Sequence, residues 1–409
     1  MTLIEYFDKD TIKNILAVLT LKPERVVYIY DSAITDGRYF DALKKCFRKH
    51  IPHIKLEKVA VDINSVQDIY EKTCAVIDKY GECAMEMTGG SELMMIGGHK
   101  AGVEKKAKIY YTDIAAGKIK DIDDPEFVLD TARLTLEDFV DAKGAAFVGE
   151  SHMEPDEKNY EDILEMCRYI FKNLRDWSYT CGYIQAARSV SEAGLHFSAN
   201  IPFLHKDGKR YKPERKMMEM FEKNGFIREL SMNANRISFT YSYPEAKTYL
   251  STYGLWLEMY VFISAKKINR FSDVKLGTMI DWDAYDDVSM AGNEIDVIIM
   301  ENSIPVFISC KLRRIATPDI NELYIQRKRL GGWFSKGVIV TSGDDKIKNT
   351  GTFKKAEEFG IIVFDRKDIK SRFWGTSLQR DFRTGYSCLE MAESIRHIGG
   401  KQGEKRKKL

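Results

Sequence analysis

Residues 294–311 read Glu-Ile-Asp-Val-Ile-Ile-Met-Glu-Asn-Ser-Ile-Pro-Val-Phe-Ile-Ser-Cys-Lys. Two apolar runs of strand length flank a short polar segment, and this pattern predicts a β-hairpin. Because side chains alternate across a strand, Glu294 and Asp296 should share one face of the first strand. Ser309 and Lys311 should likewise share one face of the second strand. Pairing of the two strands would bring these polar side chains together.

Two carboxylates and a lysine on an otherwise apolar hairpin are costly to bury unless they pair or hold a metal. Cleavage of a phosphodiester needs a divalent cation that neutralises charge on the phosphate and lowers the pKa of the attacking water. Mg²⁺ takes one or two carboxylates plus water and phosphate oxygens, so Glu294 and Asp296 are suitable ligands for Mg²⁺ or Mn²⁺. Lys311 could orient the water or stabilise the transition-state charge. The alternative is an exposed sheet face whose charges form salt bridges.

The hairpin resembles the PD-(D/E)xK restriction-endonuclease superfamily, in which an acid on one strand and an acid-x-Lys on the next form the metal site. Asp296 matches the first acid and Lys311 matches the lysine, whereas Ser309 occupies the second acidic position. The resemblance therefore implies that one metal ligand comes from elsewhere. The candidates for this missing ligand are Glu294, Glu258 on the preceding helix, and the backbone carbonyl of Cys310.

Strands and helices alternate in the first part of the chain. Strands are expected at about residues 25–31, 54–61, 83–87 and 107–111, and helices at about 38–48, 66–79 and from 91 onward. Such alternation predicts right-handed crossovers and a parallel sheet that is covered on both faces. Residues 1–150 are therefore expected to form a Rossmann-like α/β domain.

The sequence Thr-Gly-Gly-Ser-Glu at residues 88–92 follows the third expected strand. Glycines between a strand and a helix allow a ligand to approach the backbone closely, and free amides at a helix N-terminus favour phosphate. The same residues would also serve as a structural turn in which Ser91 caps the helix. The motif alone leaves both interpretations open.

In its Rossmann-like setting this motif resembles the ligand loop of the CARF domains of CRISPR-associated proteins. The resemblance implies a cyclic oligoadenylate ligand and a two-fold homodimer that builds the pocket. It implies ligand contacts from the loop itself, namely Thr88, Gly89, Gly90, Ser91 and Glu92. It also implies contacts from polar residues after the first and fourth expected strands, namely Asp31, Ser32, Thr35, Thr112 and Asp113.

The remaining chain divides into three sections. In residues 151–245 the sequence predicts helices at about 160–174 and 213–223, followed by a hairpin. This pattern resembles a small winged-helix-like α+β spacer, and the alternative is an irregular linker domain without DNA contacts. Residues 246–385 predict a restriction-endonuclease-like α/β domain, with helices at about 253–264, 318–330 and 352–359. Gln326 resembles a glutamine that some branches of the superfamily place near the site, although a solvated helix residue is the simpler interpretation. Residues 386–409 are expected to be a solvated basic tail.

Composition narrows the class of protein. The 409 residues are 44% hydrophobic and 30% charged, which is typical of a soluble globular protein. A formal net charge of +2 gives no global attraction to nucleic acid, so any such binding must be local. Seven cysteines without a Cys-x-x-Cys pair fit free thiols rather than a zinc ribbon. Lacking a signal sequence and any long apolar run, the chain is expected to be cytoplasmic and free of membranes.

The join of these domains resembles, over nearly the full chain, type III CRISPR ancillary nucleases activated by cyclic tetra-adenylate. The implied function is a metal-dependent endonuclease that cleaves DNA or RNA in antiviral defence, with ligand and catalytic sites communicating across the middle region. Because Ser309 stands where the family has an acid, an alternative function remains, namely a ligand-sensing DNA-binding regulator with a degenerate nuclease domain. The presence of Glu294, Asp296 and Lys311 together argues against this alternative. Hydrolysis of the cyclic ligand by the sensor domain is a third hypothesis. A dehydrogenase is disfavoured because no Gly-x-Gly-x-x-Gly follows the first expected strand.

Overall fold

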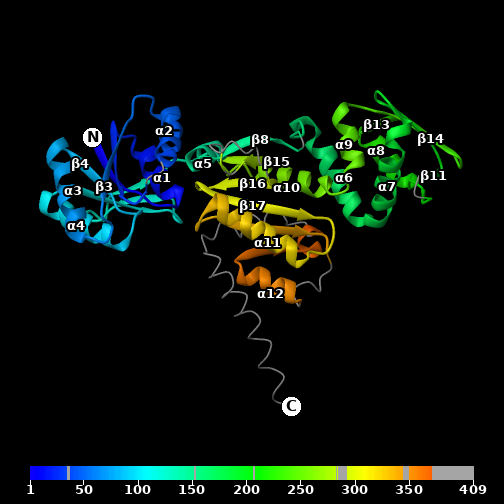
Figure 1. Ribbon diagram of the computed structural model, residues 1–409. Helices are drawn as coiled ribbons and strands as arrows, with labels where there is room; N and C mark the ends of the chain where they lie inside the picture. Colours follow the sequence, from blue (N-terminus) through cyan, green and yellow to red (C-terminus); the bar gives the residue numbers. More distant parts are fainter. Residues whose placement is uncertain are drawn as a thin grey trace, which may run out of the picture.

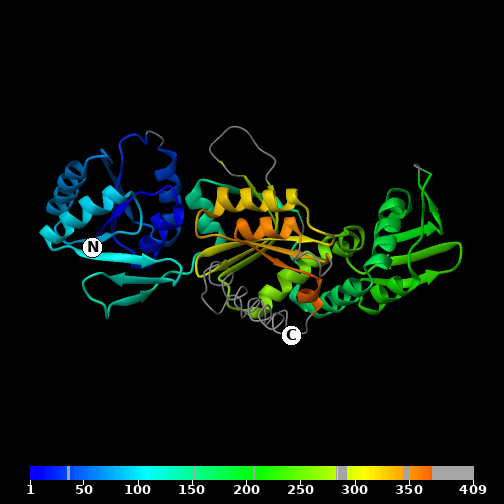
Figure 2. The ribbon, with the colours of Figure 1, turned by 90° about the horizontal axis from the view of Figure 1, so that it is seen from below.

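The computed structural model describes residues 1–34, 37–151, 153–205, 208–281, 283, 293–343 and 350–370. Thr35 and the predicted tail at 386–409 lie outside these residues. The N-terminal domain and the middle region lie on opposite sides of the C-terminal domain (Figures 1 and 2). The three parts therefore form a row in which the C-terminal domain is central.

The N-terminal domain is built on a seven-stranded sheet with the order β3-β2-β1-β4-β5-β6-β7. Its strands are β1 (Thr2–Tyr6), β2 (Arg25–Asp31), β3 (Lys55–Val61), β4 (Cys83–Glu86), β5 (Lys108–Asp113), β6 (Lys118–Asp121) and β7 (Val128–Asp130). Strands β1 to β5 pair in parallel, and β6 and β7 add in antiparallel fashion. This confirms the predicted Rossmann-like sheet.

Helices cover both faces of this sheet. They are α1 (Thr11–Leu21), α2 (Arg38–His50), α3 (Val66–Tyr80), α4 (Glu92–Lys105) and α5 (Leu136–Lys143). Apolar side chains of α1, α2 and α5 pack on one face, and those of α3 and α4 pack on the other. Gly97 and Gly98 let α4 lie close to its neighbours, since a Cβ on Gly98 would come 2.1 Å from the Tyr6 hydroxyl.

The central strand β1 was not expected from the sequence. From β1 the chain continues to β2 and β3 on one side, and it then crosses to β4 and β5 on the other. The carboxyl ends of β1 and β4 therefore meet at a topological switch point, which is where open α/β sheets bind ligands. The loop of residues 88–92 lies at this point, beside the residues that follow β1.

The middle region contains three main helices and a small sheet. The helices are α6 (Tyr160–Lys172), α7 (Leu174–Ser191) and α8 (Arg215–Lys223), preceded by the 3₁₀ turn η1 (Glu157–Asn159) and followed by α9 (Pro244–Ser251). The strands are β9 (Glu192–Ala193), β10 (His196–Asn200), β11 (Phe203–Leu204), β12 (Arg210–Tyr211), β13 (Ile227–Met232) and β14 (Arg236–Tyr241). The β13–β14 hairpin follows α8. The predicted helix and hairpin are therefore confirmed, and the prediction of an irregular linker is wrong.

The C-terminal sheet has six strands in the order β19-β18-β17-β16-β15-β8. They are β8 (Ala146–Glu150), β15 (Asp273–Asp281), β16 (Asn293–Glu301), β17 (Ile304–Lys311), β18 (Lys336–Thr341) and β19 (Ile361–Phe364). Strands β16 and β17 form the predicted hairpin, whose turn residues Asn302 and Ser303 have φ values of 47° and 66°. Because β8 pairs with β15, residues 146–150 belong to this sheet, and the predicted boundary at residue 150 is wrong.

Helices cover both faces of the C-terminal sheet as well. They are α10 (Leu255–Ile268), α11 (Thr317–Gln326) with the π-helical extension η2 (Arg327–Gly331), α12 (Gly351–Glu358) and α13 (Arg366–Lys370). Helix α10 shares a core with the middle region, in which Trp177 and Trp256 have ring centroids 6.1 Å apart. Among the described helices, none combines the length and apolar character needed to cross a bilayer. The six described cysteines are free thiols.

The N-terminal and C-terminal domains contact each other directly. A single apolar cluster includes Leu16 and Phe139 of the first domain together with Phe307 of the second. Ser303 at the β16–β17 turn accepts the Leu134 amide at 3.0 Å and donates to the Ala132 carbonyl at 2.6 Å. The N-terminal and C-terminal domains therefore touch directly, whereas the middle region lies on the opposite side of the C-terminal domain (Figure 1). Communication between the two sites across the middle region stays a prediction.

Candidate active site and ligand loop

Asp296 is the centre of the polar cluster on the β16–β17 hairpin. Regular pairing of the two strands reaches Val297 and Ile308, and beyond it the Asp296 carboxylate accepts the Cys310 amide at 2.6 Å. The same carboxylate oxygen lies 3.4 Å from the Lys311 ammonium and 3.4 Å from the Ser309 hydroxyl. The predicted proximity of Asp296, Ser309 and Lys311 is thus present in the structure.

Glu258 on α10 faces the same cluster from a different element. Its Oε2 atom is buried and has no hydrogen-bond partner among the described residues. Burial raises the pKa of Glu258 to about 8, and the negative charges of Asp296 and Glu294 act in the same direction. Burial also raises the pKa of Asp296, against the opposing effect of Lys311. Glu294 itself is exposed.

The described residues contain no group of three or more His, Cys, Asp or Glu side chains arranged to hold a metal ion. Mg²⁺, however, commonly takes only one or two protein carboxylates and completes its shell with water and substrate oxygens. The charge of Asp296 raises the pKa of the buried Glu258, and a cation between the two acids would stabilise both carboxylates. Glu258 and Asp296, with the Cys310 carbonyl, therefore fit a divalent cation.

Gln326 lies at the end of α11 and is only 5% exposed. Its side-chain amide donates to the Glu294 carbonyl at 3.2 Å, so the interpretation of a solvated residue is wrong. Ile320 and Leu323 precede it at intervals of three residues and are buried. That spacing on one helix face was the sequence signal that could have identified Gln326 as a buried residue next to the hairpin.

Glu258→Gln should remove a pH-dependent loss of stability. Because the pKa of Glu258 is raised from 4.5 to about 8, the folded protein keeps a proton between these values that the unfolded chain releases. The free energy of unfolding of the wild type should therefore fall as the pH rises through this interval, and the Gln variant should lack that contribution. Thermal melting in metal-free buffer at pH 5 and pH 8 measures the difference. Equal pH dependence in both proteins would contradict the proposed environment of Glu258.

The loop of residues 88–92 depends on its glycines for backbone reasons. A Cβ on Gly89 would come 2.6 Å from the Tyr6 carbonyl oxygen, and Gly90 has a φ of +92°. The Gly90 amide donates to Asp8 at 3.2 Å, and Ser91 caps α4 by accepting the Met94 amide at 3.3 Å. The tight turn leaves the backbone of this loop at the switch point, followed directly by the N-terminus of α4.

Thr88 and Thr112 are brought together by the buried carboxylate of Glu86. The Thr88 hydroxyl donates to Glu86 and accepts the Thr112 amide at 2.7 Å. Burial raises the pKa of Glu86, while these hydrogen bonds oppose the shift. The Thr112 side chain is also buried and lies beside the Glu86 carboxylate.

The other predicted ligand residues lie farther from this centre. Asp31 and Ser32 are at the end of β2, which β1 separates from β4. Asp113 ends β5 and pairs with Lys120 at 3.0 Å, and Glu92 is exposed at the start of α4. The structure therefore groups the loop with Thr112 and places the remaining residues around it.

Sequence reasoning missed the two acids that follow β1. Asp8 is the acceptor of the Gly90 amide, and Asp10 is 5% exposed next to it. Both were overlooked because β1 itself was overlooked, although acids directly after a strand are a recognisable signal at the carboxyl edge of a parallel sheet.

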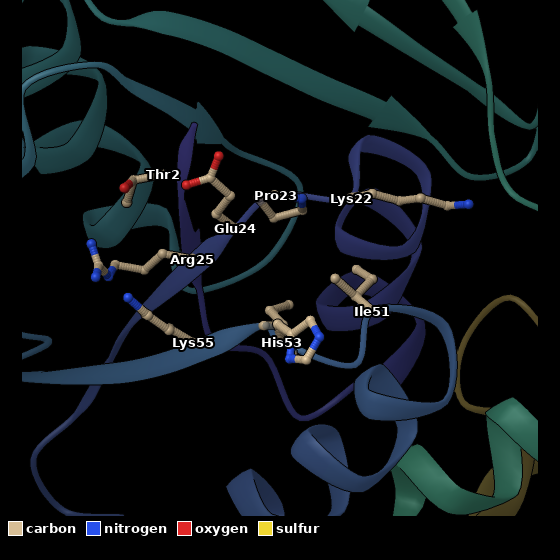
Figure 3. Close-up of a pocket in the computed structure, with 9 residues that line it drawn as sticks. Thr2, Lys22, Pro23, Glu24, Arg25, Ile51, His53 and Lys55 are labelled. Atoms are coloured by element: carbon tan, nitrogen blue, oxygen red, sulfur yellow. The ribbon is translucent and has the colours of Figure 1, made fainter.

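A hollow lies at the opposite, amino edge of the same sheet. It has a volume of about 340 Å³ and lies among the first residues of β1, β2 and β3. Figure 3 shows Lys22 directed away from Arg25 and Lys55, and Arg25 is already paired with Glu57 at 2.9 Å. The basic side chains do not converge on one point, so this hollow is not equivalent to the predicted ligand site.

Comparisons with known proteins agree with this division of the chain. Residues 2–139 match a family model described as the Card1 CARF domain, and residues 245–369 match one described as the Card1-like endonuclease domain. No curated protein matches the sequence.

Solved structures with the same fold span almost the whole chain. The protein VC1899 from Vibrio cholerae is 13% identical with a TM-score of 0.74, over 94% of this chain and 98% of that one. Can2 from Sulfobacillus thermosulfidooxidans, solved with cyclic tetra-adenylate, is 14% identical with a TM-score of 0.69, over 93% and 99%. A type III CRISPR defence DNA nuclease activated by cyclic oligoadenylate is 13% identical with a TM-score of 0.51, over 84% and 46%.

Proposed function

Because this chain joins a Card1-type CARF domain to a Card1-like endonuclease domain, we propose that it is a nuclease activated by a cyclic oligoadenylate in type III CRISPR antiviral defence. The observation that carries the proposal is the cluster in which Asp296 is held by the Cys310 amide, with Lys311 and the buried Glu258 beside it. Cyclic tetra-adenylate is the first activator to test, because the similar structure of Can2 was solved with it.

The residues of the cluster have distinct roles in the proposed cleavage. Glu258, Asp296 and the Cys310 carbonyl would hold Mg²⁺ or Mn²⁺, which supplies charge neutralisation at the phosphate and a water of lowered pKa. The Cys310 amide fixes the orientation of Asp296 through a short hydrogen bond. Burial alone would lower the pKa of Lys311, but its interactions with Asp296, Cys310 and Asp319 together raise it. Lys311 therefore keeps its positive charge and can orient water or stabilise negative charge on the phosphate.

Cleavage assays test this function directly. Labelled DNA and RNA, each single- and double-stranded, would be incubated with cyclic tri-, tetra- and hexa-adenylate in Mg²⁺ or Mn²⁺. Cleavage that requires both an activator and a metal is the expected result. Failure of every combination would overturn the proposal, and binding to DNA without cleavage would favour the ligand-sensing regulator.

An apolar face next to the ligand loop supports a homodimer. An open hollow of about 450 Å³ lies over α4, β5 and the end of β6, and its exposed side chains include Ile96 (57%), Tyr111 (46%) and Ile122 (43%). Its lining begins at Met87, directly before Thr88. A contiguous apolar surface of this kind is typical of a protein interface, and a second copy seated on it would bring two ligand loops together.

Ile96→Glu should therefore weaken the dimer and reduce activation, because it places a charge within the apolar face. Sedimentation velocity with and without cyclic tetra-adenylate measures the dimer, and calorimetry of the wild type should give one ligand per dimer. Leu204→Glu is the matched control, since Leu204 is 63% exposed but belongs to the middle region. A dimer of unchanged affinity in the Ile96 variant would place the interface elsewhere.

A further inference from the structure

Asp10 connects the N-terminal domain to a loop of the endonuclease domain. It lies between β1 and α1, and its carboxylate accepts the Trp333 amide at 3.1 Å. The neighbouring Gly332 has a φ of +67°, and a Cβ on it would come 2.3 Å from Asp10 Oδ1. The endonuclease loop therefore fits against the buried carboxylate only because residue 332 is a glycine.

On its other side Asp10 is tied to the ligand loop through Asp8. The Asp10 amide donates to Asp8 Oδ1 at 2.8 Å, and the Gly90 amide donates to Asp8 Oδ2 at 3.2 Å. Lys13 holds Asp8 Oδ2 as well, at 2.9 Å. Three consecutive hydrogen bonds thus lead from the backbone of the predicted ligand loop to the backbone of Trp333.

The same loop reaches the catalytic hairpin. Trp333 follows η2, which extends α11, and π-helical segments of this kind are often found at functional sites. A Cβ on Gly331 would come 2.7 Å from the Phe307 ring on β17, so the loop has no space to slide independently. Gln326, at the end of α11, donates to the Glu294 carbonyl two residues before Asp296.

We propose that Asp8 and Asp10, together with the segment from Gln326 to Trp333, transmit the state of the ligand loop to Asp296. This inference rests on the proposed function and specifies its regulation. An anionic ligand cannot accept the Gly90 amide while the Asp8 carboxylate occupies it, so binding displaces Asp8. Asp10 is hydrogen-bonded to Asp8, and the loop packed on Asp10 has to follow. Such a contact series couples two sites only if both bias the same rearrangement.

Variants of Asp10 test the proposed series of contacts from the ligand loop to Asp296. Asp10→Ala removes the acceptor of the Trp333 amide, whereas Asp10→Asn keeps an acceptor oxygen at the same position. The ratio of activated to basal cleavage should fall by at least about tenfold in the Ala variant and by less than about threefold in the Asn variant. Ser303→Ala is the matched control, because it removes two buried hydrogen bonds between the same two domains outside the series.

Hydrogen exchange of residues 326–334 gives a readout that does not depend on cleavage. Cyclic tetra-adenylate should change the exchange of this segment in the wild type and not in Asp10→Ala, with melting temperatures confirming that both proteins are folded. Wild-type activation in Asp10→Ala, an equal loss in Ser303→Ala, or an unchanged segment in the ligand-bound wild type would each overturn the series. If ligand binding changes the exchange of this segment in the wild type but no nucleic acid is cleaved, the proposed contact series stands and the proposed nuclease function is refuted.

Discussion

Asp296→Asn is expected to reduce metal-dependent cleavage on the order of 10²-fold or more, because it removes the charge that a cation needs at the reacting phosphate. The variant keeps an oxygen that can accept the Cys310 amide, so the hairpin should retain its geometry. Single-turnover cleavage at saturating activator measures the effect. Circular dichroism and calorimetric binding of the activator should be unchanged.

Lys311→Met should cause a comparable loss, since the lysine lies 3.4 Å from Asp296. Lys336→Met is its matched control, because Lys336 is also a sheet lysine paired with an acid but contacts Glu301, at the opposite end of β16 from the cluster. Cleavage at the wild-type rate by the Asp296 variant would refute the assigned site, whatever the Lys311 variant does.

Gly90→Val is the second substitution with a large expected effect. A φ of +92° is unfavourable for valine, and any Cβ at this position would lie 2.8 Å from the Cβ of Tyr6. The loop must shift, and its amides would then no longer be placed to meet a phosphate of the proposed activator. The activator concentration for half-maximal cleavage should rise at least about tenfold, since weaker binding to the active state lessens the population shift.

Strain alone has to be separated from loss of ligand contact in this experiment. Gly81→Val introduces a similar left-handed strain, because Gly81 has a φ of +74°. Gly81 precedes β4, at the opposite edge of the sheet, and no atom would contact its Cβ within 4 Å. Activation curves that coincide for wild type and Gly90→Val would mean that the Gly-Gly sequence is only a strand-to-helix turn.

The parts of the fold that the sequence predicted have strong local patterns. Around Asp296 and Lys311, polar and apolar residues alternate along the two strands of the β16–β17 hairpin. The short turn between the strands fixes their register. Strand β1 has no such pattern, because its five residues are all buried and include Glu5. Burial and the neighbouring Glu86 raise the pKa of Glu5 well above its ordinary value, a circumstance that only the folded sheet reveals.

The hairpin alone predicted the proximity of Asp296 and Lys311, whereas Glu258 was named only through a family resemblance. Asp296 and Lys311 come together through local pairing, whereas the approach of Glu258 depends on how α10 packs against the sheet. The contact between Asp10 and Trp333 joins residues 323 positions apart in the chain. No periodicity within either segment encodes such a contact, because it arises from the packing of two domains.

Strand β8 has a consequence for how the two domains can be separated. It supplies the last strand of the endonuclease sheet beside β15, although it follows the N-terminal domain directly in the chain. Without β8, the amides and carbonyls of β15 would form an open edge, and such edges recruit strands from other molecules. An endonuclease fragment that begins after Glu150 would carry this aggregation-prone edge. Exchange of one sensor for another, whether by recombination or by design, therefore has to leave residues 146–150 with the nuclease.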